Sequence, residues 1–64
     1  MSINVMISDD HMLMREGIRQ LLEFDGSIKV VAEAANGVEC LEKVVLVKPD
    51  VLLLDINMPK KKWN

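Results

Sequence analysis

Short strand-like runs alternate with longer helix-like stretches along this chain, and that alternation limits the folds it can adopt. Residues 3–8, 28–34 and 51–54 are short apolar runs of the kind that form buried strands. Between them, residues 11–24 and 36–47 carry apolar side chains at the spacing of an amphipathic helix. Strands that alternate with helices form a parallel sheet with helices packed on its faces. The sequence therefore predicts an α/β fold in the order strand, helix, strand, helix, strand.

The order of the strands in space follows from the handedness of their connections. Crossover connections between parallel strands are almost always right-handed. That handedness places the first strand between the other two, in the order 2-1-3, with one helix on each face of the sheet. The third strand is then an edge of the sheet.

Each helix is expected to turn one apolar stripe toward the sheet. The stripe of the first helix consists of Met14, Ile18, Leu21 and Leu22. Arg15 is expected to face outward, and Gly17 to permit a close approach to a neighbouring segment. The second helix opens with a capping box, in which Asn36 is the N-cap and Glu39 follows three residues later. Its inward residues are expected to be Val38, Cys40, Leu41, Val44 and Val45. Three methionines are expected to fill gaps in the core, namely Met6, Met12 and Met14.

Three carboxylates follow two of the predicted strands, at the points where those strands end. Asp9 and Asp10 follow the first strand, and Asp55 follows the third. Neighbouring parallel strands end at the same edge of a sheet, which is where open α/β sheets build their sites. Carboxylates that converge repel one another, and a divalent cation would neutralise them. Oxygen ligands of this kind suit Mg²⁺, which would also screen a phosphate that approaches a nucleophilic Asp.

Simpler interpretations of these residues stay open. Acids at strand ends can be solvated turn residues. His11 follows two acids, but a role at the start of the helix or in solvent is favoured over metal ligation. Asn57 can serve in a turn without contacting an ion. Cys40 is the chain's sole cysteine, so it is expected to be a small buried apolar residue and not part of a disulfide.

The bulk composition excludes several classes of protein. Half of the 64 residues are apolar and 28% are charged, which fits a compact domain and excludes a disordered tail. The net charge is −2, so no basic surface for nucleic acid is expected. No apolar run is long enough for a membrane span, and the N-terminus lacks the features of a signal peptide. The single cysteine, which has no partner for a disulfide within the chain, makes a reducing cytoplasm the expected location.

Three segments of the sequence together resemble a known family. They are DDHMLMREG over 9–17, AEAANGVECLE over 32–42 and PDVLLLDINMP over 49–59. These segments are similar to the amino-terminal half of the response-regulator receiver domain, of the NarL/FixJ type. The resemblance implies a truncated flavodoxin-like fold over residues 1–59, followed at residues 60–64 by a tail that departs from the family pattern.

The resemblance also implies what the acidic residues do. Asp55 resembles the family's phosphoacceptor, Asp10 a direct Mg²⁺ ligand and Asp9 a residue that holds the ion through water. Asn57 would add its backbone carbonyl to the ligands. The intact parent protein would take a phosphoryl group from a sensor histidine kinase and control transcription by binding DNA. The implied function is two-component signalling and not enzymatic catalysis.

The sequence departs from the family pattern after Pro59. This sequence does not contain the further strands and helices of a receiver, nor the Ser or Thr and the Lys that they carry. A phosphoryl group on this chain would therefore lack the hydroxyl and the ammonium group that donate to its oxygens in the family. The third strand would also be an exposed apolar edge, of the kind that pairs with another chain. An alternative function is therefore a self-associating fragment, a homo-oligomer joined through the third strand, with an idle acidic site. A phosphatase with an Asp nucleophile is less favoured, because such enzymes place an acid where this chain has Asn57.

Overall fold

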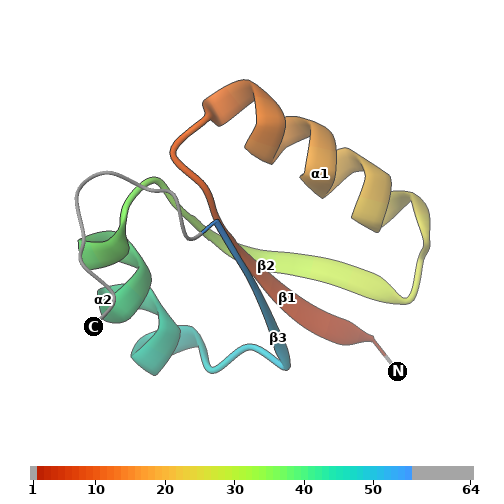
Figure 1. The fold of residues 1–64 in the computed structure, drawn as a ribbon. Helices are drawn as coiled ribbons and strands as arrows, with labels where there is room; N and C mark the ends of the chain where they lie inside the picture. The colour runs from red at the N-terminus through yellow and green to blue at the C-terminus, as the bar shows by residue number, and fades with distance from the viewer. Residues whose placement is uncertain (1, 56–64) are drawn as a thin grey trace.

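The computed structural model describes residues 2–55, and within them the fold has the predicted order of strands and helices (Figure 1). The elements are β1 (Ile3–Ser8), α1 (Met12–Phe24), β2 (Ile28–Ala34), α2 (Gly37–Val47) and β3 (Val51–Leu54). The three strands are parallel and lie in the order β2-β1-β3. Every strand spans the residues that the sequence predicts, so the α/β fold and its strand order are confirmed. Asn57 and the predicted tail at residues 60–64 lie outside the described residues.

The two helices lie on opposite faces of the sheet, as Figure 1 shows. From α2, Cys40 packs against Met6 of β1. On the other face, Ile18 of α1 lines a shallow hollow together with Ile7 of β1. Consecutive residues of a strand point to opposite faces, so Met6 and Ile7 serve different helices. Neither of the two helices within residues 2–55 has the length and hydrophobicity that a membrane crossing needs.

Buried apolar side chains lie on both faces of the sheet. Val5 and Ile7 of β1 are buried on the face that α1 covers, and a small cluster lies between α2 and the sheet. The buried members of this cluster come from β1, β2 and α2 and are Met6, Ala34 and Cys40. Partly buried apolar residues surround them, namely Ala32, Val44 and Leu52. Met6 has no exposed surface, and full burial of a side chain of this size stabilises a fold by about 1.5–3 kcal/mol. The predictions that Met6 fills the core and that Cys40 is a buried apolar residue are confirmed.

The apolar stripe of α1 is only partly covered, which contradicts the prediction. Ile18 and Leu22 are half-buried, whereas Met14 and Leu21 are 58% and 78% exposed. Met12, which was expected in the core, is exposed as well. In the described part of the chain, α1 contacts mainly β2 and much less of β1. The sheet surface beneath the helix is therefore narrower than the stripe.

The inward face of α2 is also narrower than the sequence predicts. Three of the expected inward residues are about half exposed or more, namely Val38, Leu41 and Val45. Residues four apart share one face of a helix, and here Cys40 and Val44 form that face. The flanking apolar positions project past the sheet, so their predicted burial is wrong.

The predicted capping box at the start of α2 is confirmed, whereas the predicted close approach at Gly17 of α1 is not. The Asn36 side chain accepts a hydrogen bond from the Glu39 N–H at 3.0 Å, and the Glu39 carboxylate accepts one from the Ala35 N–H at 2.9 Å. This capping box starts α2, and Lys48, in the left-handed conformation with φ 52°, ends it. A Cβ added to Gly17 would meet nothing within 4 Å among the described residues. The predicted close approach at Gly17 is therefore wrong.

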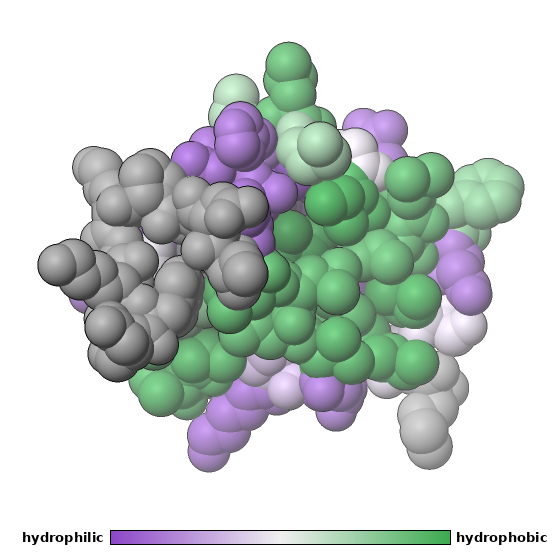
Figure 2. All heavy atoms as spheres, in the orientation of Figure 1, coloured by the Kyte–Doolittle hydropathy of each residue, from purple (hydrophilic) through white to green (hydrophobic). Residues whose placement is uncertain are grey.

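A broad apolar surface covers β3 and the adjoining flanks of the helices (Figure 2). The exposed fractions of Val51, Leu53 and Leu54 are 43%, 38% and 38%. Within the described residues β3 pairs with β1 alone, so its outer edge has no strand beside it there. The predicted exposed apolar edge is confirmed.

Candidate functional site

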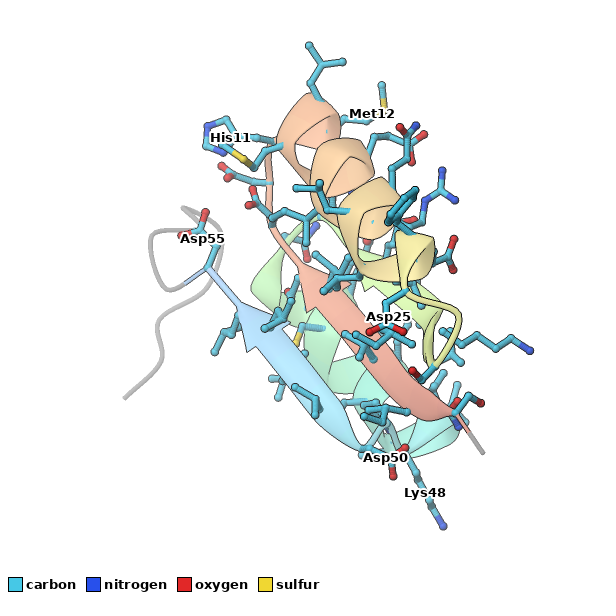
Figure 3. The ribbon with its side chains drawn as sticks, turned by 90° about the vertical axis from the view of Figure 1, so that its right-hand side faces the viewer. His11, Met12, Asp25, Lys48, Asp50 and Asp55 are labelled. Carbon is cyan, nitrogen blue, oxygen red and sulfur yellow. The ribbon has the colours of Figure 1, made fainter. Side chains whose placement is uncertain are left out.

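The carboxyl ends of β1 and β3 lie side by side, and each is followed by acidic residues (Figure 3). Hydrogen bonds continue the sheet past the strand ends. The Asp9 N–H donates to the Ala34 carbonyl at 3.0 Å, and the Asp55 N–H donates to the Ser8 carbonyl at 2.9 Å. These bonds fix the backbone of both acids at the same edge of the sheet. Asp10 follows at the start of the loop into α1.

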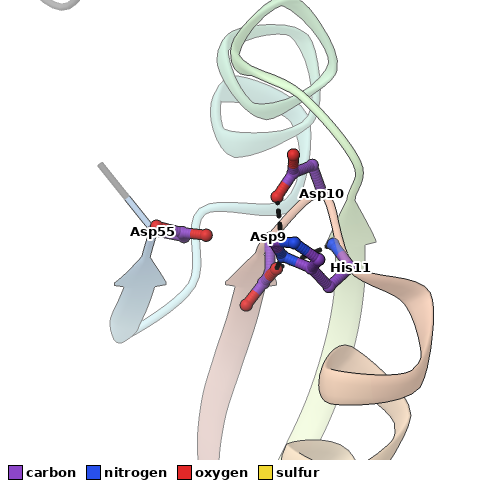
Figure 4. A group of neighbouring side chains, drawn as sticks. All are labelled: Asp9, Asp10, His11 and Asp55. Atoms are coloured by element: carbon purple, nitrogen blue, oxygen red, sulfur yellow. Dashed lines mark hydrogen bonds and ion pairs between the residues drawn. The ribbon is translucent and has the colours of Figure 1, made fainter. Parts of the chain in front are cut away.

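Four side chains converge at this edge (Figure 4). Asp9, Asp10, His11 and Asp55 each offer one potential ligand atom, and these atoms all lie within 4.8 Å of one another. Asp9 is buried, Asp10 and Asp55 are half-buried, and the His11 side chain is 72% exposed. The cluster therefore opens to solvent on the side of His11. Asn57, the fourth predicted ligand, lies outside the described residues.

His11 links the two acids that precede it. Its backbone N–H donates to Asp9 Oδ1 at 2.8 Å, and its ring Nδ1 lies 3.2 Å from the same oxygen. The same ring nitrogen lies 2.9 Å from Asp10 Oδ1. His11 is also the N-cap residue of α1, although its side chain makes no capping hydrogen bond. The predicted position at the helix start is confirmed, and the ring in addition contacts both carboxylates.

Arg15 of α1 holds the backbone of Asp9 through a side-chain hydrogen bond. Its Nη1 donates to the backbone carbonyl of Asp9 at 2.6 Å, and its Nε donates to Glu33 Oε1 at 3.0 Å. The Arg15 side chain is 14% exposed, so its predicted outward orientation is wrong. The cause is Glu33, which β2 presents to the face that α1 covers. One side chain thus ties the loop, α1 and β2 together.

The donor set at this edge fits a divalent cation. Oδ1 of Asp10 is buried and receives no hydrogen bond from the described residues, since the His11 ring approaches it only as an ion-pair contact. A buried carboxylate oxygen without a donor is costly, and a cation would satisfy it. Carboxylate oxygens from Asp9, Asp10 and Asp55 suit Mg²⁺, which keeps several waters in its shell.

An open, mostly apolar hollow of about 260 Å³ adjoins the acids between α1 and β3. Its walls include Ile7, Ile18 and Leu53, and its rim includes Asp9 and Asp55. The acids therefore have water on one side and apolar surface on the other. Interactions between charges are stronger beside a medium of low dielectric constant than in bulk water.

Sequence reasoning did not identify two contacts of this site. It did not foresee that the His11 ring would touch both acids, although the residue directly follows them in the chain. It also placed Arg15 in solvent. The available signal was Glu33, an oppositely charged residue near the end of the second predicted strand, whose position relative to the helix depends on the tertiary fold.

Comparisons with known proteins agree on one family. A family profile described as the response regulator receiver domain matches residues 5–62. Among curated proteins, the chain is 46% identical over 57 residues to the oxygen regulatory protein NreC of Staphylococcus aureus. That match covers 89% of this chain and 26% of NreC. The chain therefore spans about a quarter of the length of this curated relative.

Solved structures of response regulators match the fold of this chain. The signal receiver domain of NarL from Mycobacterium tuberculosis matches with a TM-score of 0.89 and 43% identity, over 95% of this chain and 49% of that one. RcsB of Salmonella enterica serovar Typhimurium, solved bound to promoter rprA in the presence of the phosphomimetic BeF3⁻, matches with a TM-score of 0.89 and 31% identity. The latter match covers 100% of this chain and 32% of RcsB.

Proposed function

This chain belongs to the response regulator receiver family, and on that premise we propose that Asp55 is its phosphoacceptor and that Asp9, Asp10 and Asp55 hold Mg²⁺. The backbone carbonyl of Asn57 is the fourth proposed ligand. Receiver domains are signalling domains of two-component systems and bind Mg²⁺ at an acidic site. The observation that supports these roles most is the convergence of the three carboxylates at the carboxyl edge of β1 and β3.

Phosphoryl transfer to Asp55 is a substitution at phosphorus. A carboxylate oxygen of Asp55 attacks the phosphorus atom and forms a new P–O bond. The bond between phosphorus and the leaving group breaks, and the leaving group departs with the electron pair. Bound Mg²⁺ supplies positive charge that reduces repulsion between the carboxylates and the phosphoryl oxygens. Asp9 and Asp10 are the residues that would hold the ion together with Asp55.

The proposed phosphoryl donor is a sensor histidine kinase, the class of protein with which receivers of the NarL and RcsB type interact. From a phosphohistidine the leaving group is an imidazole nitrogen. We assign residues 1–59 to the receiver portion and propose that the parent protein is a cytoplasmic, DNA-binding regulator of transcription. For this chain itself we propose no contact with nucleic acid or with a membrane.

The test is phosphorylation of the purified chain by acetyl phosphate, followed by intact-mass measurement with and without Mg²⁺. The wild type is expected to gain one phosphoryl group in the presence of Mg²⁺, and Asp55→Asn to gain none. Asp50→Asn is the matched control, because it makes the same change at the other end of β3, where the Asp50 carboxylate bonds the Asn4 N–H at 2.8 Å. That variant is expected to behave as the wild type does. Equal labelling of wild type and Asp55→Asn, or no labelling of either, would contradict the proposed acceptor.

The exposed edge of β3 favours a second candidate function, self-association into a homo-oligomer. Val51, Leu53 and Leu54 present apolar side chains beside unpaired strand edge within the described residues. Such an edge tends to pair with a strand of another chain, and a second copy offers an identical edge. In this alternative the acidic cluster is idle.

Two measurements separate the two candidates, namely sedimentation velocity over a range of protein concentrations and thermal unfolding with and without Mg²⁺. Self-association through β3 predicts a dimer whose population rises with concentration and does not change with Mg²⁺. The signalling function predicts that Mg²⁺ raises the melting temperature, because an ion that binds the folded state alone stabilises it. A monomer at every concentration would exclude the second candidate.

A further inference from the structure

We propose that His11 supplies a nitrogen ligand to the acidic cluster, so that this site also binds divalent cations that prefer nitrogen, with Zn²⁺ as the probe ion. The inference rests on the cation site of the proposed function and adds a fourth side chain and a second class of ion to it. Carboxylates alone offer oxygen, which suits Mg²⁺, whereas imidazole suits ions such as Zn²⁺, Ni²⁺ and Cu²⁺.

The spacing of the donor atoms supports this assignment. The His11 Nδ1 atom lies 2.9 Å from Asp10 Oδ1 and 3.2 Å from Asp9 Oδ1. At the tetrahedral angle that Zn²⁺ prefers, two ligand atoms with bonds of about 2.1 Å are about 3.4 Å apart. The ring nitrogen therefore already lies near the spacing of a neighbouring ligand from each of the two carboxylate oxygens. A ligand atom of Asp55 completes the group within 4.8 Å.

The backbone around His11 holds the ring near the acids. The residue has an extended conformation, with φ −102° and ψ 105°, at the start of α1. Its N–H is bonded to Asp9 Oδ1 at 2.8 Å, so one proposed ligand residue fixes the backbone of another. Since the side chain is 72% exposed, an ion can arrive from solvent and retain water at its remaining positions.

The simpler interpretation is that the ring only pairs with the two carboxylates as a charged partner and leaves when an ion binds. In that case His11 contributes nothing to the affinity for Zn²⁺. The two interpretations make opposite predictions for a variant without the imidazole, and the chain is well suited to the comparison. His11 is its sole histidine, so every imidazole nitrogen resonance comes from this residue.

The experiment compares tag-free wild type with His11→Gln, which keeps a polar side chain of similar reach. Zn²⁺ and Mg²⁺ are titrated separately by calorimetry, and the ring nitrogens are followed by long-range ¹H–¹⁵N NMR. Zn²⁺ is expected to shift the Nδ1 resonance of the wild type strongly, and Mg²⁺ to leave it nearly unchanged. His11→Gln is expected to weaken Zn²⁺ binding by about tenfold or more and Mg²⁺ binding by less than about twofold.

Each result has a definite meaning. Equal Zn²⁺ affinity in wild type and His11→Gln, with no movement of the Nδ1 resonance, overturns the inference and leaves the Mg²⁺ site standing. Asp10→Asn tests the site itself and is expected to weaken both ions. If Asp10→Asn binds Mg²⁺ as the wild type does, the proposed Mg²⁺ site fails, and Zn²⁺ binding that survives this change overturns the inference too. Cys40 is 1% exposed, so its thiol does not compete for Zn²⁺ in the folded chain.

Discussion

The two outer strands of the sheet have very different surroundings. Beside β2, each helix sends one charged side chain to the strand backbone. The Glu23 carboxylate of α1 accepts a hydrogen bond from the Val30 N–H at 3.1 Å, and the Lys43 ammonium of α2 donates to the Glu33 carbonyl at 2.6 Å. These contacts place one negative and one positive side chain against the backbone of β2.

Beside β3 the surroundings are apolar. Val51, Leu53 and Leu54 are all more than one third exposed, and Figure 2 shows hydrophobic residues across the face that contains this strand. The helices also have exposed apolar side chains, whereas their charged residues Glu23 and Lys43 contact β2. Proteins protect sheet edges with charged side chains, and β2 has that protection. Of the two outer strands, β3 is therefore the edge suited to receive another strand.

Loss of Arg15 is expected to have the largest effect, because this residue ties α1 to β2 and so supports the protected edge. Arg15→Gln removes the hydrogen bonds that Arg15 donates to Glu33 Oε1 and to the Asp9 carbonyl, and the expected loss of stability is about 1–3 kcal/mol. Urea unfolding followed by circular dichroism measures it. Arg19→Gln is the control, because Arg19 is more exposed and its contact with Glu33 is longer, at 3.3 Å. Equal effects of the two changes would mean that Arg15 has no special role.

A lysine on β3 tests whether the missing charge is what distinguishes the two edges. Val51→Lys places an ammonium group on the exposed strand, remote from the acidic cluster. If β3 mediates self-association, the dissociation constant measured by sedimentation should rise by about tenfold or more, equivalent to about 1.4 kcal/mol. Leu46→Lys adds the same charge at an exposed position of α2 and should change association less. Comparable effects of both lysines would assign the change to net charge and not to the strand.

Removal of the charges beside β2 tests whether they prevent this edge from pairing with another strand. Glu23→Leu together with Lys43→Met deletes both side-chain contacts to the β2 backbone. In a Val51→Lys background, this double change is expected to restore part of the self-association, now through β2. The recovery should be smaller than the original loss, because the charges of Arg19 and of Glu33 in β2 itself remain at that edge. Continued monomeric behaviour at high concentration would show that the charges of Glu23 and Lys43 do not protect the edge.

Local patterns predicted the strands and the acidic edge, whereas the helix faces depended on the tertiary fold. The three strands were predictable because each apolar run carries its own signal, and parallel pairing then brings Asp9 and Asp55 together. The burial of Met14 and the exposure of Arg15 were predicted wrongly for one reason. A periodic stripe shows that a helix has an apolar face, but the width of the sheet and the position of Glu33 decide which part of that face is covered.

A more stable α1 should raise the stability of the fold without changing association through β3. Gly17 is exposed, and an added Cβ would meet no atom of the described residues. Gly17→Ala should therefore stabilise the fold by about 0.5–1 kcal/mol, because alanine loses less conformational entropy in a helix. Thermal unfolding measures the gain. The dissociation constant of any dimer should stay the same, and a change in it would mean that α1 contributes to the interface.

The smallest expected effect concerns the turn that leads into β2. The Ser27 hydroxyl donates to Asp25 Oδ1 at 2.7 Å and the Ser27 N–H donates to the same atom at 3.0 Å, which holds the pKa of Asp25 below its usual range. Because the folded pKa lies below the unfolded one, the carboxylate stabilises the fold above the unfolded pKa, and this contribution is lost as pH falls through the folded pKa. Asp25→Asn should therefore be less stable than the wild type at neutral pH, and the difference should disappear in acid. A difference in urea midpoint that does not change with pH would show that these hydrogen bonds do not depend on the charge of Asp25.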